Sequence, residues 1–251
     1  HESPQFDHLK DDVEVFADLD SIIWIFDRGY TRYLRFCEIK HSDDDFVSDG
    51  VISRCVQLLQ SDPSIVLAFP KTILVDEDGD EIEAHDDGAG WDRPSPSHRF
   101  EFSLTRWGLC NLLYGVARTE VLRDTCLLQD FPGSDLVLQA DLAVRGRVRQ
   151  VEGEYLYRRI HSRATGGLKD ESLAQFYVPD REKSFDARHI RLFRHLAATA
   201  WSADVALSEK RAMFGALVRH GIWARRRLTG EVVTLLRRMP GGITRRVGSS
   251  A

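Results

Sequence analysis

Three consecutive carboxylates, Asp43-Asp44-Asp45, are the residues of this chain whose types and spacing point most directly to chemistry. Neighbouring like charges repel one another, so a loop carries such a cluster at low cost only when solvent or a cation neutralises it. Oxygen ligands suit hard divalent cations such as Mg²⁺. Two interpretations therefore stand side by side, a divalent-metal site and an ordinary solvated acidic turn.

Helical and strand patterns alternate along the chain around this cluster. Apolar residues recur at helical spacing over 50–60, and 65–69 is a continuous apolar run, as expected of a strand buried on both faces. We further expect strands at 73–75, 112–117 and in two pieces over 148–157, a turn at 76–80, and a surface loop over 85–98 that could act as a lid. Helices are predicted at 100–113, after Thr119 as N-cap, and at 136–144, 187–201, 208–227 and 231–238.

Composition and charge narrow the class of protein. The chain has 251 residues and a net charge of −5, which fits one large globular domain, or one domain with an appendage. Its four cysteines are widely spaced, which favours a reduced, cytoplasmic setting over a disulfide scaffold or a zinc site. No apolar run is long enough to span a bilayer. Acidic residues concentrate over 43–92 and basic residues over 219–246, so a cation site is expected in the first segment and an anionic surface or a solvated helix face in the second.

A short N-terminal pattern offers one alternative function. The run Val15-Phe16-Ala17-Asp18-Leu19-Asp20 resembles the nucleophile strand of haloacid-dehalogenase-type phosphatases. In those enzymes, one carboxylate of the Asp-x-Asp pair is the nucleophile and the other is the acid/base. The turn that usually follows is absent here, because Ser21 leads directly into apolar residues.

A longer series of short motifs resembles bacterial family-2 glycosyltransferases. The series runs through Asp43-Asp44-Asp45, Ser61-Asp62-Pro63, Val75-Asp76-Glu77-Asp78-Gly79, Leu113-Tyr114-Gly115-Val116-Ala117-Arg118, Gly133-Ser134-Asp135 and Arg158-Arg159-Ile160-His161. It covers about residues 40–165. The resemblance implies a GT-A fold, which is an α/β fold with a mainly parallel, twisted sheet and flanking helices. It also implies inverting transfer of a sugar from a nucleoside-diphosphate donor to an acceptor hydroxyl, of the kind used in making cell-surface polysaccharides.

The resemblance implies a role for each motif. Asp43 and Asp45 would bind Mg²⁺ or Mn²⁺, and Asp44 would be a further ligand or a contact to the donor diphosphate. Asp135 would be the general base, although from sequence alone it could equally be a helix cap. His161 would complete the metal shell or touch the diphosphate, unless it is an ordinary surface histidine.

The same resemblance implies that Arg158 or Arg159 binds the donor diphosphate. Because adjacent strand residues face opposite ways, only one of the two arginines is expected to reach the donor. Trp107 and Tyr114 could stack on a sugar, but a core role fits them better.

The first forty residues depart from the family pattern. The opening strand with its Pro-Thr-Tyr-Asn-like turn, and the later strand that ends in a nucleotide-contacting Asp, are both missing from this sequence. The N-terminal half is therefore either absent or diverged. A non-catalytic binding domain derived from the same scaffold stays open as a second function.

These patterns predict two parts and a set of partners. Residues 1–180 would form the GT-A-like domain, and 181–251 a C-terminal helical segment with a basic tail. The expected partners are a nucleotide-sugar donor and a carbohydrate or lipid-linked acceptor, with no nucleic acid. The basic helices would either dock at the inner face of a membrane or form a solvated surface.

Overall fold

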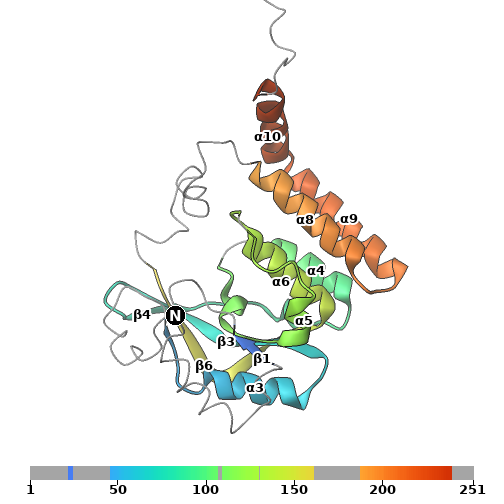
Figure 1. The fold of residues 1–251 in the computed structure, drawn as a ribbon. Helices are drawn as coiled ribbons and strands as arrows, with labels where there is room; N and C mark the ends of the chain where they lie inside the picture. The colour runs from blue at the N-terminus through green and yellow to red at the C-terminus, as the bar shows by residue number, and fades with distance from the viewer. Residues whose placement is uncertain (1–21, 25–45, 107–108, 130, 161–186, 239–251) are drawn as a thin grey trace, which may run out of the picture.

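A central strand and the helices on its two sides organise the chain, as seen in a computed structural model that describes residues 22–24, 46–106, 109–129, 131–160 and 187–238. The strands are β1 (Ile22–Trp24), β2 (Phe46–Val47), β3 (Ile65–Val75), β4 (Glu81–Ala84), β5 (Val116–Arg118) and β6 (Arg147–Arg159). The helices are α3 (Val51–Ser61), α4 (Pro96–Thr105), α5 (Thr119–Arg123), α6 (Ser134–Arg145), α8 (Arg188–Ser202), α9 (Leu207–Trp223) and α10 (Arg225–Arg238), with 3₁₀ turns η3 (Ala89–Asp92) and η4 (Asn111–Tyr114). Figure 1 shows these elements in place.

The long strand β3 lies in the middle of the sheet, whose strand order is β1-β5-β3-β6-β2. Its first part pairs with β5 and its last part with β4, both antiparallel. Its other edge pairs with β6 in parallel. The run 65–70 is buried throughout, as expected for a strand covered on both faces.

The prediction of a mainly parallel sheet is wrong for the described part of the chain, where β3–β6 is the one parallel pair and the other four pairs are antiparallel. Chain connections explain the difference. A short turn through Gly79, whose φ is 91°, joins β3 to β4, and so short a link allows only antiparallel pairing. The connection from β3 to β6 is long and contains α4–α6, so it can return the chain in parallel. The mixed α/β class with flanking helices is confirmed.

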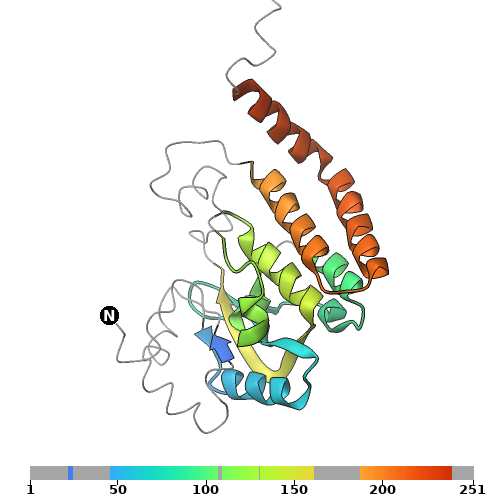
Figure 2. The ribbon, with the colours of Figure 1, turned by 45° about the vertical axis from the view of Figure 1, so that its right-hand side comes forward.

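Helices cover both faces of the sheet. On one side α3 buries Val51, Cys55, Val56 and Leu59 against Ile65, Ala68 and Val116. On the other side Leu138, Leu142 and Ala143 of α6 pack with Leu67 and Phe69. Figures 1 and 2 show α3 on the opposite side of the sheet from α4 and α6. Burying about a dozen large apolar side chains in these two layers is the main term that stabilises the fold.

The C-terminal helices α8 and α9 continue the second layer. Leu192, Leu196 and Ala200 of α8 and Met213 and Leu217 of α9 share one buried cluster with Phe100 of α4 and Val137 of α6. Among the described residues, no helix is long and apolar enough to cross a membrane.

Two glutamates of these helices accept hydrogen bonds from the N-terminal turns of other helices. Glu209 of α9 accepts from the backbone N–H of Ser97 at 2.7 Å, in the first turn of α4. Glu231 of α10 accepts from the N–H groups of His189 and Ile190 at 3.0 Å, in the first turn of α8. A carboxylate there satisfies free N–H groups and interacts favourably with the helix dipole. The two residues therefore join the C-terminal helices to the helices they cap.

Replacing Glu209 with Gln should lower the free energy of unfolding by about 1 kcal/mol at pH 7, a typical effect of losing a helix cap. Ser97, whose hydrogen bonding is the largest cause, and Ser95 hold the pKa of Glu209 below its ordinary value. A carboxylate whose pKa is lower in the folded than in the unfolded protein stabilises the fold at any pH above its unfolded-state pKa. This stabilisation is lost as the pH falls through the folded-state pKa. The difference between the two proteins in urea unfolding should therefore shrink when the pH is lowered from 7 to below about 4.

Glu101→Gln is the matched control for this prediction. Glu101 also joins α4 to α9, through Arg219 at 2.6 Å, but both side chains are largely exposed. Exposed pairs contribute little, so this variant should unfold like the parent protein. A difference between Glu209→Gln and the parent protein that stays constant from pH 7 to pH 3 would contradict the proposed role of the carboxylate.

Several local predictions need correction. The helix expected at 100–113 ends at Thr105, and the chain re-forms a 3₁₀ turn at Asn111–Tyr114. Thr119 does not cap α5, because Arg118 occupies the cap position. The two strand pieces over 148–157 are one strand, β6, with Gly153 at φ 77° in the irregular stretch opposite Phe69–Lys71. The helix expected at 208–227 ends at Trp223, and α10 begins at Arg225 rather than at 231.

Candidate functional site

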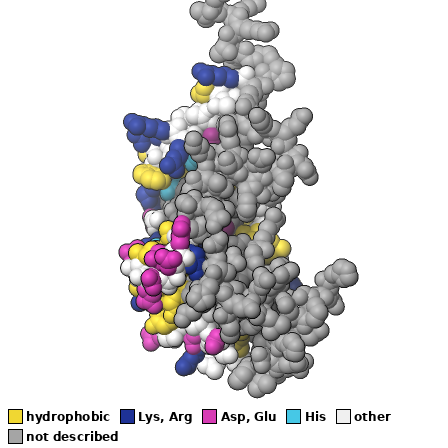
Figure 3. Space-filling model, turned by 90° about the vertical axis from the view of Figure 1, so that its left-hand side faces the viewer, with side chains coloured by type: hydrophobic (Ala, Val, Ile, Leu, Met, Phe, Trp, Pro, Cys, Tyr) yellow, Lys and Arg dark blue, Asp and Glu magenta, His cyan; other side chains and the backbone are white. Residues whose placement is uncertain are grey.

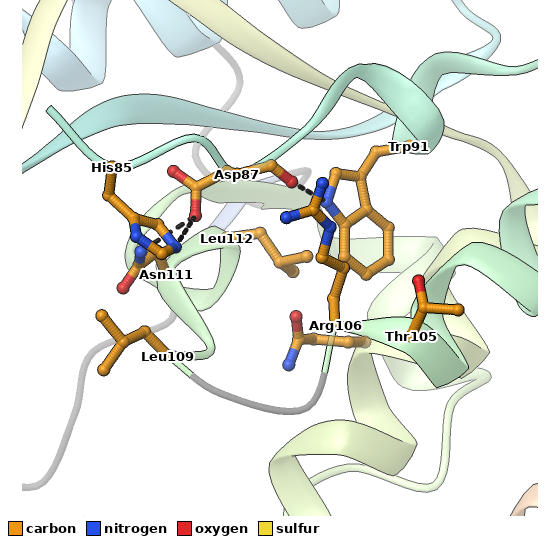
Figure 4. A pocket seen from close by; sticks show the side chains of 9 residues that line it. His85, Asp87, Trp91, Thr105, Arg106, Leu109, Asn111 and Leu112 are labelled. Atoms are coloured by element: carbon orange, nitrogen blue, oxygen red, sulfur yellow. Dashed lines mark hydrogen bonds and ion pairs between the residues drawn. The ribbon is translucent and has the colours of Figure 1, made fainter.

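A small polar pocket lies where three separate segments meet α6. Its volume is about 210 Å³, and it is lined by His85, Asp87, Trp91, Thr105, Arg106, Leu109, Asn111, Leu112 and Gln139. Figure 4 shows the segment after β4 on one side and the stretch leading into η4 on the other. The pocket is below the size that takes drug-sized ligands, so it suits a single small ring or group.

The carboxylate of Asp87 is the most buried charged group of this pocket, since the residue is 9 % exposed. Its Oδ1 accepts a hydrogen bond of 2.9 Å from the Asn111 side-chain amide and lies 3.8 Å from His85 Nε2. Burial raises the pKa of Asp87, and the hydrogen bond from Asn111 offsets part of this rise. Both partners are visible in Figure 4.

Two polar atoms of residues that line the pocket, Asp87 Oδ2 and Gln139 Nε2, are fully buried and make no hydrogen bond of good geometry. The Thr72 hydroxyl lies beside the Asp87 carboxylate, and the Cys110 thiol lies beside the Gln139 amide. Buried polar atoms are usually satisfied, because leaving one without a partner costs about 1–3 kcal/mol. Since neither atom exposes surface to the pocket, Thr72 and Cys110 are the groups placed to bond with them.

Aromatic and cationic side chains form the remaining wall. The indole N–H of Trp91 donates to the backbone oxygen of Asp87 at 2.9 Å, and its ring meets Phe102 edge-on at 5.1 Å. The guanidinium of Arg106 lies 5.0 Å from the centre of the Phe102 ring. Trp91 is 3 % exposed, so its packing in the hydrophobic core holds this wall in position.

Asp135 lies one helical turn before Gln139, in the first turn of α6. Gly133, in a left-handed conformation with φ 95°, occupies the N-cap position, so Asp135 is not the cap. Its side chain is partly exposed, and Oδ1 accepts from the N–H of Leu136 at 2.9 Å. Burial raises the pKa of the Cys110 thiol well above its ordinary value, and the neighbouring Asp135 carboxylate raises it further. Asp135 therefore lies beside Cys110, which immediately precedes the pocket residue Asn111.

Arg158 is connected to the same pocket. Its Nη1 donates to Asn111 Oδ1 at 2.7 Å, and its guanidinium lies 5.5 Å from the centre of the Tyr114 ring. A chain of contacts therefore runs from Arg158 through Asn111 to Asp87. Arg158 comes from β6, Asn111 from η4 and Asp87 from the segment after β4, so the tertiary fold assembles the group.

Arg159 points elsewhere, as expected for adjacent strand residues. The residue is 4 % exposed, and its Nη1 donates to the backbone oxygens of Asp76 and Glu77 at 3.0 and 2.6 Å. It therefore holds the turn between β3 and β4. Of the two arginines, Arg158 is therefore the one that contacts a residue of the pocket.

The predicted metal ligands Asp43, Asp44, Asp45 and His161 lie outside the described residues, as do Trp107 and the phosphatase candidates Asp18 and Asp20. Within the described residues, no group of three or more His, Cys, Asp or Glu side chains is placed to hold a metal. The metal site therefore stays a sequence prediction. Its donor set fits the expected ions, because Mg²⁺ and Mn²⁺ favour carboxylate oxygens.

Sequence reasoning missed the pocket residues His85, Asp87, Trp91, Asn111 and Gln139. The loop over 85–98 was expected to be a surface lid, whereas Asp87 and Trp91 are buried. One available signal was the polar Asn111 directly before the apolar pair Leu112-Leu113, since a polar side chain inside a buried stretch needs a partner.

Comparison with protein-family models, with curated proteins and with solved structures finds no significant match.

Proposed function

We propose that this chain is a nucleotide-sugar-dependent glycosyltransferase whose general base is Asp135. The observation that carries the proposal is the position of Asp135, which is partly exposed in the first turn of α6. It lies beside Cys110, whose neighbour Asn111 accepts a hydrogen bond from Arg158 of β6. Such a carboxylate can take a proton from a hydroxyl group.

In the proposed reaction, a hydroxyl oxygen of the acceptor attacks C1 of the donor sugar. The new bond forms as the bond between C1 and the diphosphate oxygen breaks, and the hydroxyl proton moves to Asp135. Arg158, which contacts Asn111 and Tyr114, would pair with diphosphate oxygens. A metal bound by Asp43 and Asp45 would stabilise negative charge on the leaving diphosphate.

We assign the pocket to the sugar ring of the acceptor. Its volume fits a single ring, and its lining offers the carboxylate of Asp87, the amides of Asn111 and Gln139, and the aromatic wall of Trp91. Hydroxyl groups of a ring would bond with polar groups of this lining, because a hydroxyl both donates and accepts. The acceptor would then present a hydroxyl near the first turn of α6.

Thermal unfolding with Mn²⁺ and a panel of nucleoside diphosphates tests the donor site. We expect stabilisation only when metal and nucleotide are both present, by about 5–10 °C at a hundredfold excess over Kd. Asp45→Asn should abolish this stabilisation, because it removes a ligand from the predicted metal site. Removing the metal with a chelator should have the same effect on the parent protein.

Asp49→Asn is the matched control, since Asp49 is an exposed acid four residues farther along the chain. It should bind nucleotide as the parent does. A folded protein that shows no shift with any nucleotide would contradict the proposal and favour a non-catalytic binding domain.

A further inference from the structure

The last helix, α10, has an inner side and an outer side with different partners. On the inner side, Glu231 bonds to the first turn of α8, including His189 Nδ1 at 2.6 Å. Leu228 and Leu235 lie three residues before and four residues after Glu231, so they share its side of the helix, and both are partly buried. This inner side anchors α10 to α8 and α9.

The outer side of α10 carries apolar side chains that no described element covers. Val232, Val233 and Leu236 are 45 %, 44 % and 49 % exposed. At 100° per residue, Arg225, Arg226 and Arg237 fall around this apolar group. We call these six residues the outer face of α10. Arg225 falls between Val232 and Leu236, and Arg226 and Arg237 lie beside Val233. Apolar side chains interleaved with arginines on one side are typical of a helix that lies in a membrane interface.

The end of α9 extends this pattern. Ile222 and Trp223 are 58 % and 69 % exposed, and one residue, Ala224, separates them from the run Arg225-Arg226-Arg227. Tryptophan prefers the boundary between lipid and water, because its ring is large and apolar and its N–H is polar. The apolar and cationic residues therefore continue from α9 onto α10.

The charges of the C-terminal helices indicate what kind of surface the outer face of α10 binds. Residues 187–238 contain eleven Lys and Arg and three Asp and Glu, whereas the whole chain has a net charge of −5. Two of the three acids, Glu209 and Glu231, cap helices. On the face in Figure 3, most visible acidic side chains lie over the lower part of the molecule, and the upper part shows mainly basic and hydrophobic ones. A second copy of this chain would place arginines against arginines, so an anionic surface is the better complement.

We propose that the outer face of α10, together with Ile222 and Trp223, docks the protein on an anionic lipid bilayer. The apolar side chains enter the boundary between headgroups and acyl chains, and the arginines pair with lipid phosphates. Exposed apolar residues between the arginines favour a bilayer over nucleic acid, which would meet a purely polar basic face. Figures 1 and 2 show α10 projecting from the helical layer at the end remote from the sheet, so docking leaves the pocket open. This inference is independent of the proposed glycosyltransferase activity.

Co-flotation with lipid vesicles tests the proposal. The full chain should float with vesicles of phosphatidylcholine and 30 % phosphatidylglycerol, and not with pure phosphatidylcholine, and 0.5 M salt should weaken binding. The triple variant Arg225→Gln, Arg226→Gln, Arg237→Gln should bind roughly 100-fold more weakly. Leu236→Ser with Trp223→Ser should also reduce binding while leaving the net charge unchanged.

A charge-matched control separates a specific face from general attraction. Arg54, Lys71 and Arg123 are exposed basic residues on other elements, and replacing all three with Gln removes the same charge. This control should float like the parent, and circular dichroism should show that every variant is folded. The proposal would be overturned if the control variant lost as much vesicle binding as the arginine variant, if the protein bound neutral vesicles equally well, or if it did not float at all. Tighter binding to an oligonucleotide would also overturn it. So would self-association that depends on Leu236, seen in sedimentation, without lipid binding.

Discussion

Replacing Asp135 with Asn should lower the rate of sugar transfer about 1,000-fold, the usual range for losing a general base. Asparagine keeps the size of the side chain and can still accept from the Leu136 N–H, but it cannot take the acceptor proton. The loss should fall on kcat, and the affinity for metal and nucleoside diphosphate should be unchanged. Transfer of a radiolabelled sugar, with the donor identified by thermal unfolding, measures the rate.

The matched control for Asp135 is Glu120→Gln. Glu120 is an exposed acid in the first turn of α5, so its replacement removes the same charge from an equivalent helix position. Its rate should equal that of the parent. If Asp135→Asn retained full transfer activity, another group would have to take the proton, and the proposed role of Asp135 would be wrong.

Replacing Arg99 with Met should lower the free energy of unfolding by about 3 kcal/mol, the range for losing hydrogen bonds from a buried charged group. Arg99 is 3 % exposed and lies in α4. Its Nε donates to the oxygen of Ala143 at 2.6 Å, at the C-terminal end of α6, and Nη1 donates to the oxygens of Arg93 and Pro94 at 2.6 and 2.7 Å. A positive charge at a helix C-terminus is favourable, and Met would leave these carbonyl groups without their donor.

Urea unfolding of three variants tests this role of Arg99. Arg54→Met changes an exposed arginine of α3 and should have little effect. Arg99→Lys keeps the charge but cannot reproduce the planar set of donors, so it should recover only part of the loss. Equal stability of Arg99→Met and Arg54→Met would show that the hydrogen bonds of Arg99 contribute little.

Local patterns in the sequence were enough to predict several elements. The helix expected at 50–60 is α3, and the apolar run 65–69 begins β3. The helix expected at 136–144 is α6, which has Gly146 at its C-cap. These predictions succeed because helix and strand periodicity, glycine and proline act within a few residues.

Local sequence patterns did not predict whether the strands pair in parallel or antiparallel. The resemblance implied mainly parallel pairing, but β3 pairs antiparallel with β5, whose residues lie about 50 positions farther along the chain. Pairing between distant strands depends on how the intervening helices pack, and a local pattern does not contain that information.

In the candidate site too, some features follow from local sequence and others only from the tertiary structure. The resemblance singled out Asp135 as the general base, and local strand geometry predicted that Arg158 and Arg159 face opposite ways. Only the tertiary structure decided that Arg158 meets Asn111 while Arg159 holds a turn. Likewise, only the fold brings Asp87, Asn111 and Gln139 to one pocket and buries Arg99 at the end of another helix. Residue type and spacing determine which chemistry a side chain can perform, whereas long-range packing determines which side chains meet.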